Sequence, residues 1–178
     1  MSCVWFCSDF HLTHKSMANR YRSYMGFKSV EEHDRYFIDQ WKQHVSKRDI
    51  VWCLGDMAVT KEGFAMYHDL PGTKHLVLGN HDFDHDVDII DFAMIFDQIQ
   101  GLKKKYKSWL SHIPVHPEEL YGHKNIHGHI HGAPPMGPDY FNCCPEFVIP
   151  RFNRPFVKLQ EIYDYFDQQR TLEDSLDH

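Results

Sequence analysis

Short apolar runs along the chain alternate with longer amphipathic segments, a pattern that predicts both strands and helices. Each short run is bounded by glycine, proline, aspartate or asparagine, as buried strands usually are. Strands are predicted at residues 3–7, 49–54, 74–78, 93–96, 107–110, 124–127, 142–149 and 155–159.

Helical periodicity is clearest in the segment after residue 28. Ser29 and Glu32 have the spacing of a capping box, and Phe37 and Trp41 recur at helical spacing among charged residues. Helices are predicted at residues 29–46, 60–70 and 160–169. Strands alternate with helices early and follow one another later, so we predict an α/β domain with a mixed sheet.

Length and composition favour one folded domain. The chain has 178 residues, of which 42% are hydrophobic and 25% are charged. We predict a single domain over residues 1–170 and an acidic, frayed tail over 171–178. No apolar run reaches the length of a membrane helix, and the first residues lack the basic start of a signal peptide.

Five cysteines and 15 histidines add chemical information. The odd number of cysteines and the absence of a C-x-x-C motif predict buried thiols in a reducing, intracellular compartment. The net charge of −6 disfavours extended nucleic-acid binding. The basic cluster at residues 103–107 is therefore interpreted as a solvated edge strand or turn.

Ligand-type side chains follow the predicted strands, at the strand ends where ligands gather in α/β sheets. Glycines beside them allow a sharp turn or the close approach of an ion. These positions are Asp9-x-His11, Gly55-Asp56, Gly79-Asn80-His81-Asp82, Ser111-His112 and Gly128-His129-x-His131.

The spacing of these residues predicts a metal site. Asp9 and His11 are two residues apart, so in an extended segment both point to one side. His129 and His131 have the same relation. Nitrogen and oxygen ligands together suit manganese, iron, zinc, cobalt or nickel. Seven candidates exceed the needs of one tetrahedral zinc and suit two ions about 3.5–4 Å apart.

Single residues in this set have simpler interpretations. Asp9 and Asp56 could be caps or turn residues, and Asn80 could form a turn. His112 alone fits a buried core histidine. The occurrence of all five motifs in one chain favours the metal site over these alternatives.

In order and spacing, these motifs resemble those of calcineurin-like metallophosphoesterases. The resemblance runs from residue 8 to about residue 159 and is closest to the small single-domain members of bacteria and phages. It implies a four-layer α/β/β/α sandwich of two mixed sheets flanked by helices. It also implies a cytoplasmic protein of a bacterium or of a phage-infected cell.

The resemblance further implies a role for each residue. One ion would be held by Asp9, His11 and His131, with Asp56 bridging to the other. The second ion would be held by Asn80, His112 and His129. His81 would protonate or stabilise the leaving group, and Asp82 would orient His81. A hydroxide between the ions would attack phosphorus.

The implied activity is that of a metal-dependent hydrolase, a phosphodiesterase or phosphatase that acts on a small phosphoester. A nucleotide is one candidate substrate, and manganese is the favoured metal. The alternatives are a non-catalytic interaction scaffold of the same fold and a structural metal site without turnover. The sequence leaves the substrate, the native metals and the oligomeric state open.

Other residues have two interpretations each. His14 either lines the substrate cleft or lies on the surface, and His127 either supports the site or is an ordinary strand residue. Arg20 and Arg22 are candidates for contact with a phosphate group. We expect specificity to depend on the loops at residues 13–28, 59–63 and 132–140, and no catalytic role is expected for Cys143 or Cys144.

Overall fold

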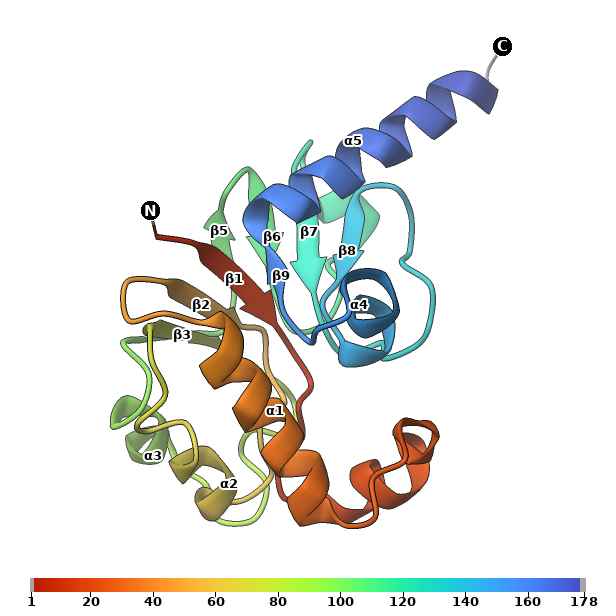
Figure 1. Cartoon of the computed structure of the whole chain (residues 1–178). Helices are drawn as coiled ribbons and strands as arrows, with labels where there is room; N and C mark the ends of the chain where they lie inside the picture. The colour runs from red at the N-terminus through yellow and green to blue at the C-terminus, as the bar shows by residue number, and fades with distance from the viewer. Residues whose placement is uncertain (1, 177–178) are drawn as a thin grey trace.

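The computed structural model describes residues 2–176, which form two mixed β-sheets with helices packed around them (Figure 1). The first sheet has the strand order β4-β3-β2-β1-β9. Its strands are β1 (Val4–Cys7), β2 (Ile50–Cys53), β3 (Thr73–Val77), β4 (Gln98–Gln100) and β9 (Val157–Lys158). Strands β1 to β4 are parallel and β9 is antiparallel to β1, so the loops after β1, β2 and β3 leave from one edge.

The second sheet has the order β5-β6-β7-β8. Its strands are β5 (Lys103–Lys105), β6 (Ser108–Leu110), β7 (Lys124–His127) and β8 (Tyr140–Asn142). Within this second sheet, β6, β7 and β8 are parallel and β5 is antiparallel to β6. The edge position of β5 and the turn that follows it confirm the prediction for the basic cluster at residues 103–107.

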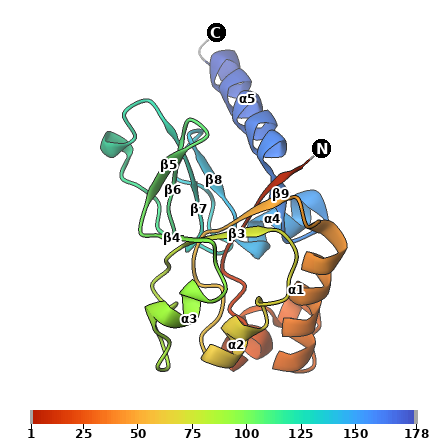
Figure 2. The ribbon, with the colours of Figure 1, turned by 90° about the vertical axis from the view of Figure 1, so that its left-hand side faces the viewer.

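Three helices lie on one side of the first sheet, and the second sheet and α5 lie on the other (Figure 2). The α-helices are α1 (Val30–His44), α2 (Lys61–Ala65), α3 (Ile89–Ala93), α4 (Pro145–Phe152) and α5 (Leu159–Leu176). The shorter turns are the π-helical η1 (Met17–Tyr21) and the 3-10 helices η2 (Ser23–Met25) and η3 (Pro117–Glu119). The far end of α5 extends away from both sheets (Figure 1).

Strands β1 and β2, at the centre of the first sheet, are buried on both faces, which explains why all their residues are apolar. Along β1, Trp5 faces a core that contains Phe37 and Trp41 of α1. The next residue, Phe6, faces a second core that contains Phe141 of β8. This alternation between two cores holds the helices on one side of β1 and the second sheet on the other.

Two predicted strands were wrong. Residues 93–96 contain the end of α3 and the turn after it, and the strand lies at β4. A capping box between Asp88 and Asp91 starts α3 and overrides the apolar pattern. In the segment 142–149, β8 ends at Asn142 and α4 begins at Pro145, because proline is favoured in the first turn of a helix.

The last helix is longer than predicted. Helix α5 begins at Leu159 and continues to Leu176, beyond the expected end at residue 169. Most of the expected frayed tail therefore lies in α5, and residues 177–178 lie outside the described residues. Within residues 2–176, no helix has the length and apolar character needed to cross a membrane.

All five cysteines are free thiols. Four of them are buried, which confirms the prediction of buried thiols for those four, and Cys3 is half-buried. The Sγ atoms of Cys7 and Cys53 lie 3.9 Å apart on the neighbouring strands β1 and β2.

Candidate metal centre

Five loops bring the seven predicted ligand residues to one place. The loops follow β1, β2 and β3 of the first sheet and β6 and β7 of the second. Backbone hydrogen bonds join them in pairs: Asp9 N–H donates to the Gly55 carbonyl at 3.0 Å, and Gly128 N–H donates to the His112 carbonyl at 2.9 Å. A further bond, from the His129 N–H to Oδ2 of Asp9 at 2.9 Å, joins the loops of the second sheet to those of the first.

One group of ligand atoms surrounds the Asp9 carboxylate. Oδ1 of Asp9 lies 3.6 Å from Nε2 of His11 and 3.9 Å from Nε2 of His131. Oδ2 of Asp56 lies 3.8 Å from the same His11 nitrogen. Such separations leave room for one cation that each of these atoms could contact at about 2 Å.

A second group lies on the other side of Asp56. Oδ2 of Asp56 lies 3.3 Å from Nε2 of His112. Oδ1 of Asn80 lies 2.9 Å from that nitrogen and 3.0 Å from Nδ1 of His129. The structure thus brings all seven predicted residues together, in two groups that share the Asp56 carboxylate.

Unpartnered atoms in the first group fit a cation. Oδ1 of Asp9 and both ring nitrogens of His11 are buried without a hydrogen-bond partner. A buried polar atom without a partner is costly, and such atoms call for an explanation, of which a bound ion is one. Donor atoms of Asp9, Asp56 and His112 also lie within 4.8 Å of one another. Neutral imidazoles and carboxylates suit a divalent first-row metal.

The backbone of the site is strained. In the described residues, twelve non-glycine residues have positive φ angles, a conformation that L-residues rarely adopt. Five of the twelve belong to the seven candidate ligands, namely Asp9, His11, Asp56, His129 and His131. Strain of this kind concentrates at functional sites, where other contacts over-determine the backbone.

Two glycines allow the loops to approach. A Cβ atom at Gly128 would overlap Ser8 Oγ and Asp9 Oδ2, and one at Gly79 would overlap the side chain and backbone nitrogen of Asp56. Only glycine leaves enough room for the neighbouring loops to approach each other at these two positions. The sequence had predicted that the glycines allow a close approach. Any larger residue would push a candidate ligand out of position.

Neighbouring groups leave one oxygen of Asp9 free for an ion. Oδ2 accepts hydrogen bonds from Ser8 Oγ, from the backbone N–H of His129 at 2.9 Å and from the Cys144 thiol at 3.2 Å. Oδ1 is the atom that remains. No catalytic role was predicted for Cys144, and its contact with this carboxylate, 135 residues away in sequence, could not be seen from the motifs.

His112 is oriented in the same manner. Its Nδ1 atom donates to the Leu54 carbonyl at 2.8 Å, which points Nε2 toward Asp56 and Asn80. Metal-bound histidines commonly make such a bond through their other nitrogen.

The electrostatic balance favours ionised carboxylates. Burial opposes ionisation of Asp9, but contact with His11 and the charge of His112 outweigh it, so the pKa of Asp9 lies well below its ordinary value. Burial also lowers the pKa of His112, but the Asp56 and Asp9 carboxylates outweigh it and raise that pKa to about 9. A cation that binds Nε2 must displace this proton.

A buried ion pair supports His131. Oε1 of Glu146, in the first turn of α4, lies 3.4 Å from His131 Nδ1 and accepts a 2.9 Å hydrogen bond from Nε of Arg22. Arg22 is fully buried and also donates to the carbonyls of Asp9 and Phe10. Arg22 therefore holds the Asp9 loop and Glu146 together, and its guanidinium is not available to a phosphate group.

His81 lies beside the two groups, but its carboxylate partner differs from the expected one. Its Nδ1 atom donates to Asp84 Oδ2 at 2.7 Å, and its backbone N–H donates to Asp56 Oδ1 at 2.8 Å. The expectation that Asp82 orients His81 was wrong. Asp82 points into the core, where it accepts hydrogen bonds from the backbone N–H groups of Gly79 at 2.7 Å and Met57 at 3.1 Å.

Asp82 thus ties the loops after β2 and β3 to each other. Burial and the nearby Asp56 charge raise the pKa of Asp82 to about 7, against the lowering effect of its two backbone bonds. Its contribution to the site is to fix Gly79 and Met57, and with them the neighbouring ligands Asn80 and Asp56.

A cleft of about 640 Å³ opens beside the first group. His14 lines it, as one of its two interpretations predicted, and His11, His81 and His131 line the side toward the candidate ligands. His127 instead is a buried residue of β7 whose Nδ1 lies 2.8 Å from the Gly128 carbonyl. Burial lowers the pKa of His127 to about 4, so its ring is neutral.

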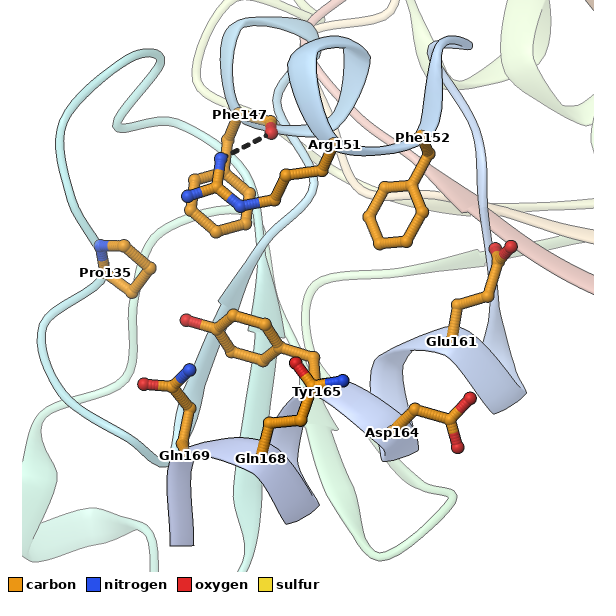
Figure 3. A pocket seen from close by; sticks show the side chains of 9 residues that line it. All are labelled: Pro135, Phe147, Arg151, Phe152, Glu161, Asp164, Tyr165, Gln168 and Gln169. Atoms are coloured by element: carbon orange, nitrogen blue, oxygen red, sulfur yellow. Dashed lines mark hydrogen bonds between the residues drawn. The ribbon is translucent and has the colours of Figure 1, made fainter. Parts of the chain in front are cut away.

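Another depression lies between α4 and α5, away from these residues (Figure 3). Phe147, Phe152 and Tyr165 form its apolar side, and the Arg151 guanidinium stacks on the Phe147 ring at 3.6 Å. Arg151 also donates to the Phe147 carbonyl at 2.8 Å. Because no candidate ligand lines this depression, it carries none of the chemistry of the metal centre.

Comparisons with known proteins give relatives without a stated function. No model of a known protein family matches the chain. The Gene 66 proteins of Mycobacterium phages D29 and L5 are 37% and 41% identical to it over 90 residues. These matches cover 48% of this chain but only 43% and 42% of the phage proteins, so the chain spans less than half of their length.

Two further comparisons cover more of the chain. An uncharacterized protein of Methanocaldococcus jannaschii is 28% identical over 133 residues, which are 67% of this chain and 73% of that protein. The crystal structure of a protein of unknown function from Aquifex aeolicus matches with a TM-score of 0.69. It covers 92% of this chain and 99% of that one at 22% identity, a likeness that shows the fold alone.

Proposed function

We propose that this chain is a metal-dependent phosphoesterase of the calcineurin-like type, which binds two divalent cations and hydrolyses a small phosphodiester or phosphomonoester. The observation that carries the proposal is the convergence of seven ligand residues into two groups that share Asp56. The unpartnered buried atoms of Asp9 and His11 support it. The two mixed sheets with helices outside them support the finer assignment of a four-layer metallophosphatase fold.

The ligand sets suit first-row metals, with manganese favoured and iron, zinc, nickel or cobalt as alternatives. Asp9, His11 and His131 would hold one ion, and Asn80, His112 and His129 the other, with Asp56 between them. When bound, two such ions neutralise phosphoryl oxygens and lower the pKa of a coordinated water. His112 donates through Nδ1 to the Leu54 carbonyl, and His131 donates through Nδ1 to Glu146, which keeps the Nε2 atom of each ring directed to the site.

His81 is the proposed proton donor. It borders the cleft, it is half exposed, and it is not among the atoms of either ligand group. Its Nδ1 atom is held by Asp84, so Nε2 is the atom available to a leaving-group oxygen. A group placed beside the ions in this manner can donate a proton as the ester bond breaks.

Hydrolysis of p-nitrophenyl phosphate and bis-p-nitrophenyl phosphate by chelator-treated protein, with Mn²⁺ returned, tests the proposal. We expect turnover with Mn²⁺ and its loss with chelator. The variant His81→Ala should keep its bound Mn²⁺ but lose most turnover, about a hundredfold or more. The control His68→Ala, at an exposed histidine that belongs to neither ligand group, should behave as the parent. Absence of hydrolysis with Mn, Ni, Co, Fe and Zn would favour the scaffold alternative.

A further inference from the structure

The cleft beside the candidate metal centre has one wall that the proposed chemistry does not use. On that side lie Met17 and Tyr21, both from the π-helical turn η1. Turns of this kind are rare and occur frequently at functional sites. The cleft volume of about 640 Å³ suits a small organic molecule that reaches from the ions to this wall.

The wall offers an aromatic surface. The Tyr21 side chain is 62% exposed, although it lines the cleft, whereas Met17 is buried beneath the same turn. The Arg20 guanidinium lies 5.8 Å from the centroid of the Tyr21 ring, where it restrains the ring by a cation–π contact. A restrained, solvent-facing tyrosine provides a flat surface on which another ring can stack.

The charges around the cleft disfavour a second anionic group. No lysine or arginine is among the described residues that line it. Arg22 is buried and donates to Glu146, whose side chain lines the cleft. A second phosphate group in the cleft would lie near the Glu146 carboxyl group, with no lysine or arginine in the described lining to compensate its charge.

We propose that this cleft binds an uncharged aromatic group of a phosphoester, such as a nucleobase, by stacking on Tyr21, while the phosphate group lies at the metal centre. This inference rests on the proposed function for the phosphate end and adds the substrate class at the other end. Tyr21 is then a specificity-determining residue.

Binding of two matched compounds to the Mn²⁺-loaded protein tests the inference, with His81→Ala as the background in every titration because it should keep Mn²⁺ and lose most turnover. Adenosine 5′-monophosphate and ribose 5-phosphate carry the same phosphate group, and only the first has a base. By calorimetry we expect the nucleotide to bind roughly tenfold more tightly, since stacking on one aromatic side chain has about that effect. Tyr21→Ala should remove this preference and leave ribose 5-phosphate binding unchanged, and Tyr21→Phe should retain it.

Tyr24→Ala is the matched control, because Tyr24 is 65% exposed on the adjacent turn and does not line the cleft. It should bind both compounds as the parent does. Equal binding of the two compounds, or a Tyr21→Ala variant that keeps the preference, would overturn the inference and leave the phosphoesterase proposal intact. A base preference in a protein that hydrolyses no phosphoester would keep the inference and overturn the proposed function. Failure of both compounds to bind would also overturn the inference, and the hydrolysis assay would decide the proposed function separately.

Discussion

The Nδ1 atom of His81 donates a 2.7 Å hydrogen bond to Oδ2 of Asp84, so the ring of the proposed proton donor is held by a carboxylate three residues along the chain. The turn that joins them is closed by a second bond, from the Asp84 N–H to the His81 carbonyl at 3.2 Å. Both side chains are half exposed, so the contact orients the ring more than it stabilises the fold.

Replacement of Asp84 should therefore lower turnover with little effect on stability. We expect Asp84→Ala to reduce kcat about tenfold, because a freely rotating His81 spends less time directed at the leaving group. Asp84→Asn, which retains an acceptor oxygen, should recover part of that loss. Metal occupancy should match the parent in both variants. The control Asp69→Ala removes a carboxylate that also contacts a histidine but lies fully on the surface. An unchanged kcat in Asp84→Ala would show that the contact does not position His81.

Glu146 should matter for metal affinity although it is not in either proposed ligand set. Glu146→Gln removes the charge that His131 and Arg22 share, and we expect the affinity for one Mn²⁺ ion to fall by roughly 10–100-fold. The variant should also lose about 3 kcal/mol of unfolding free energy, because the Arg22 charge stays buried without its partner. Calorimetric titration and urea unfolding measure the two effects. Glu118→Gln, at an exposed glutamate of η3, is the control. Two tight Mn²⁺ sites in Glu146→Gln would contradict a supporting role.

Gly128 should tolerate no side chain. In Gly128→Ala the added Cβ would collide with Ser8 Oγ and Asp9 Oδ2, and displacement of Asp9 should weaken Mn²⁺ binding at least tenfold. Gly101→Ala is the matched control, because a Cβ there meets open space. Mn²⁺ titration of the two variants makes the comparison. Parental affinity in Gly128→Ala would mean that the close approach of the β1 and β7 loops is dispensable.

His75 should make the fold sensitive to acid independently of the metal centre. This residue of β3 is buried against the Trp52 ring, and burial together with the Lys105 charge lowers its pKa. The folded state therefore binds fewer protons than the unfolded state, whose histidines have a pKa near 6.5. The stability that neutral His75 contributes is therefore fully present above the unfolded pKa. It is lost as the pH falls from that value through the lower pKa of the folded state.

Urea unfolding of the metal-free protein between about pH 7.5 and pH 5 tests this expectation. The loss of unfolding free energy on acidification should be smaller in His75→Gln than in the parent. The same substitution at the exposed His68 serves as the control. An identical pH dependence in His75→Gln and the parent would remove His75 as a source of the acid sensitivity.

The ligand residues could be predicted because their information is local. Each follows an apolar strand, and parallel strands end at a common edge, so Asp9, Asp56 and Asn80 meet without any knowledge of side-chain contacts. The glycines in the same motifs mark the positions where two loops approach too closely for a Cβ atom, as Gly79 and Gly128 do.

The supporting residues could not be predicted in this manner. Arg22 and Glu146 are 124 residues apart, and nothing near either one indicates the other. The resemblance implied that Asp82 orients His81, but the turn after β3 directs Asp82 into the core and brings Asp84 to the histidine. The helix α4 was not predicted because its short apolar segment is equally compatible with a strand. The position of Pro145 in the first turn distinguishes the two in the structure.

The most direct test of the two-ion account is a titration of the metal-free protein with Mn²⁺, with bis-p-nitrophenyl phosphate hydrolysis followed at each step. The account predicts that two ions bind per chain and that hydrolysis reaches its full rate only as the second site fills. In Asp56→Asn, which removes the carboxylate shared by both groups, at least one site should be lost together with turnover. Two ions bound in the parent without hydrolysis at any Mn²⁺ concentration, or full occupancy and turnover in Asp56→Asn, would contradict it.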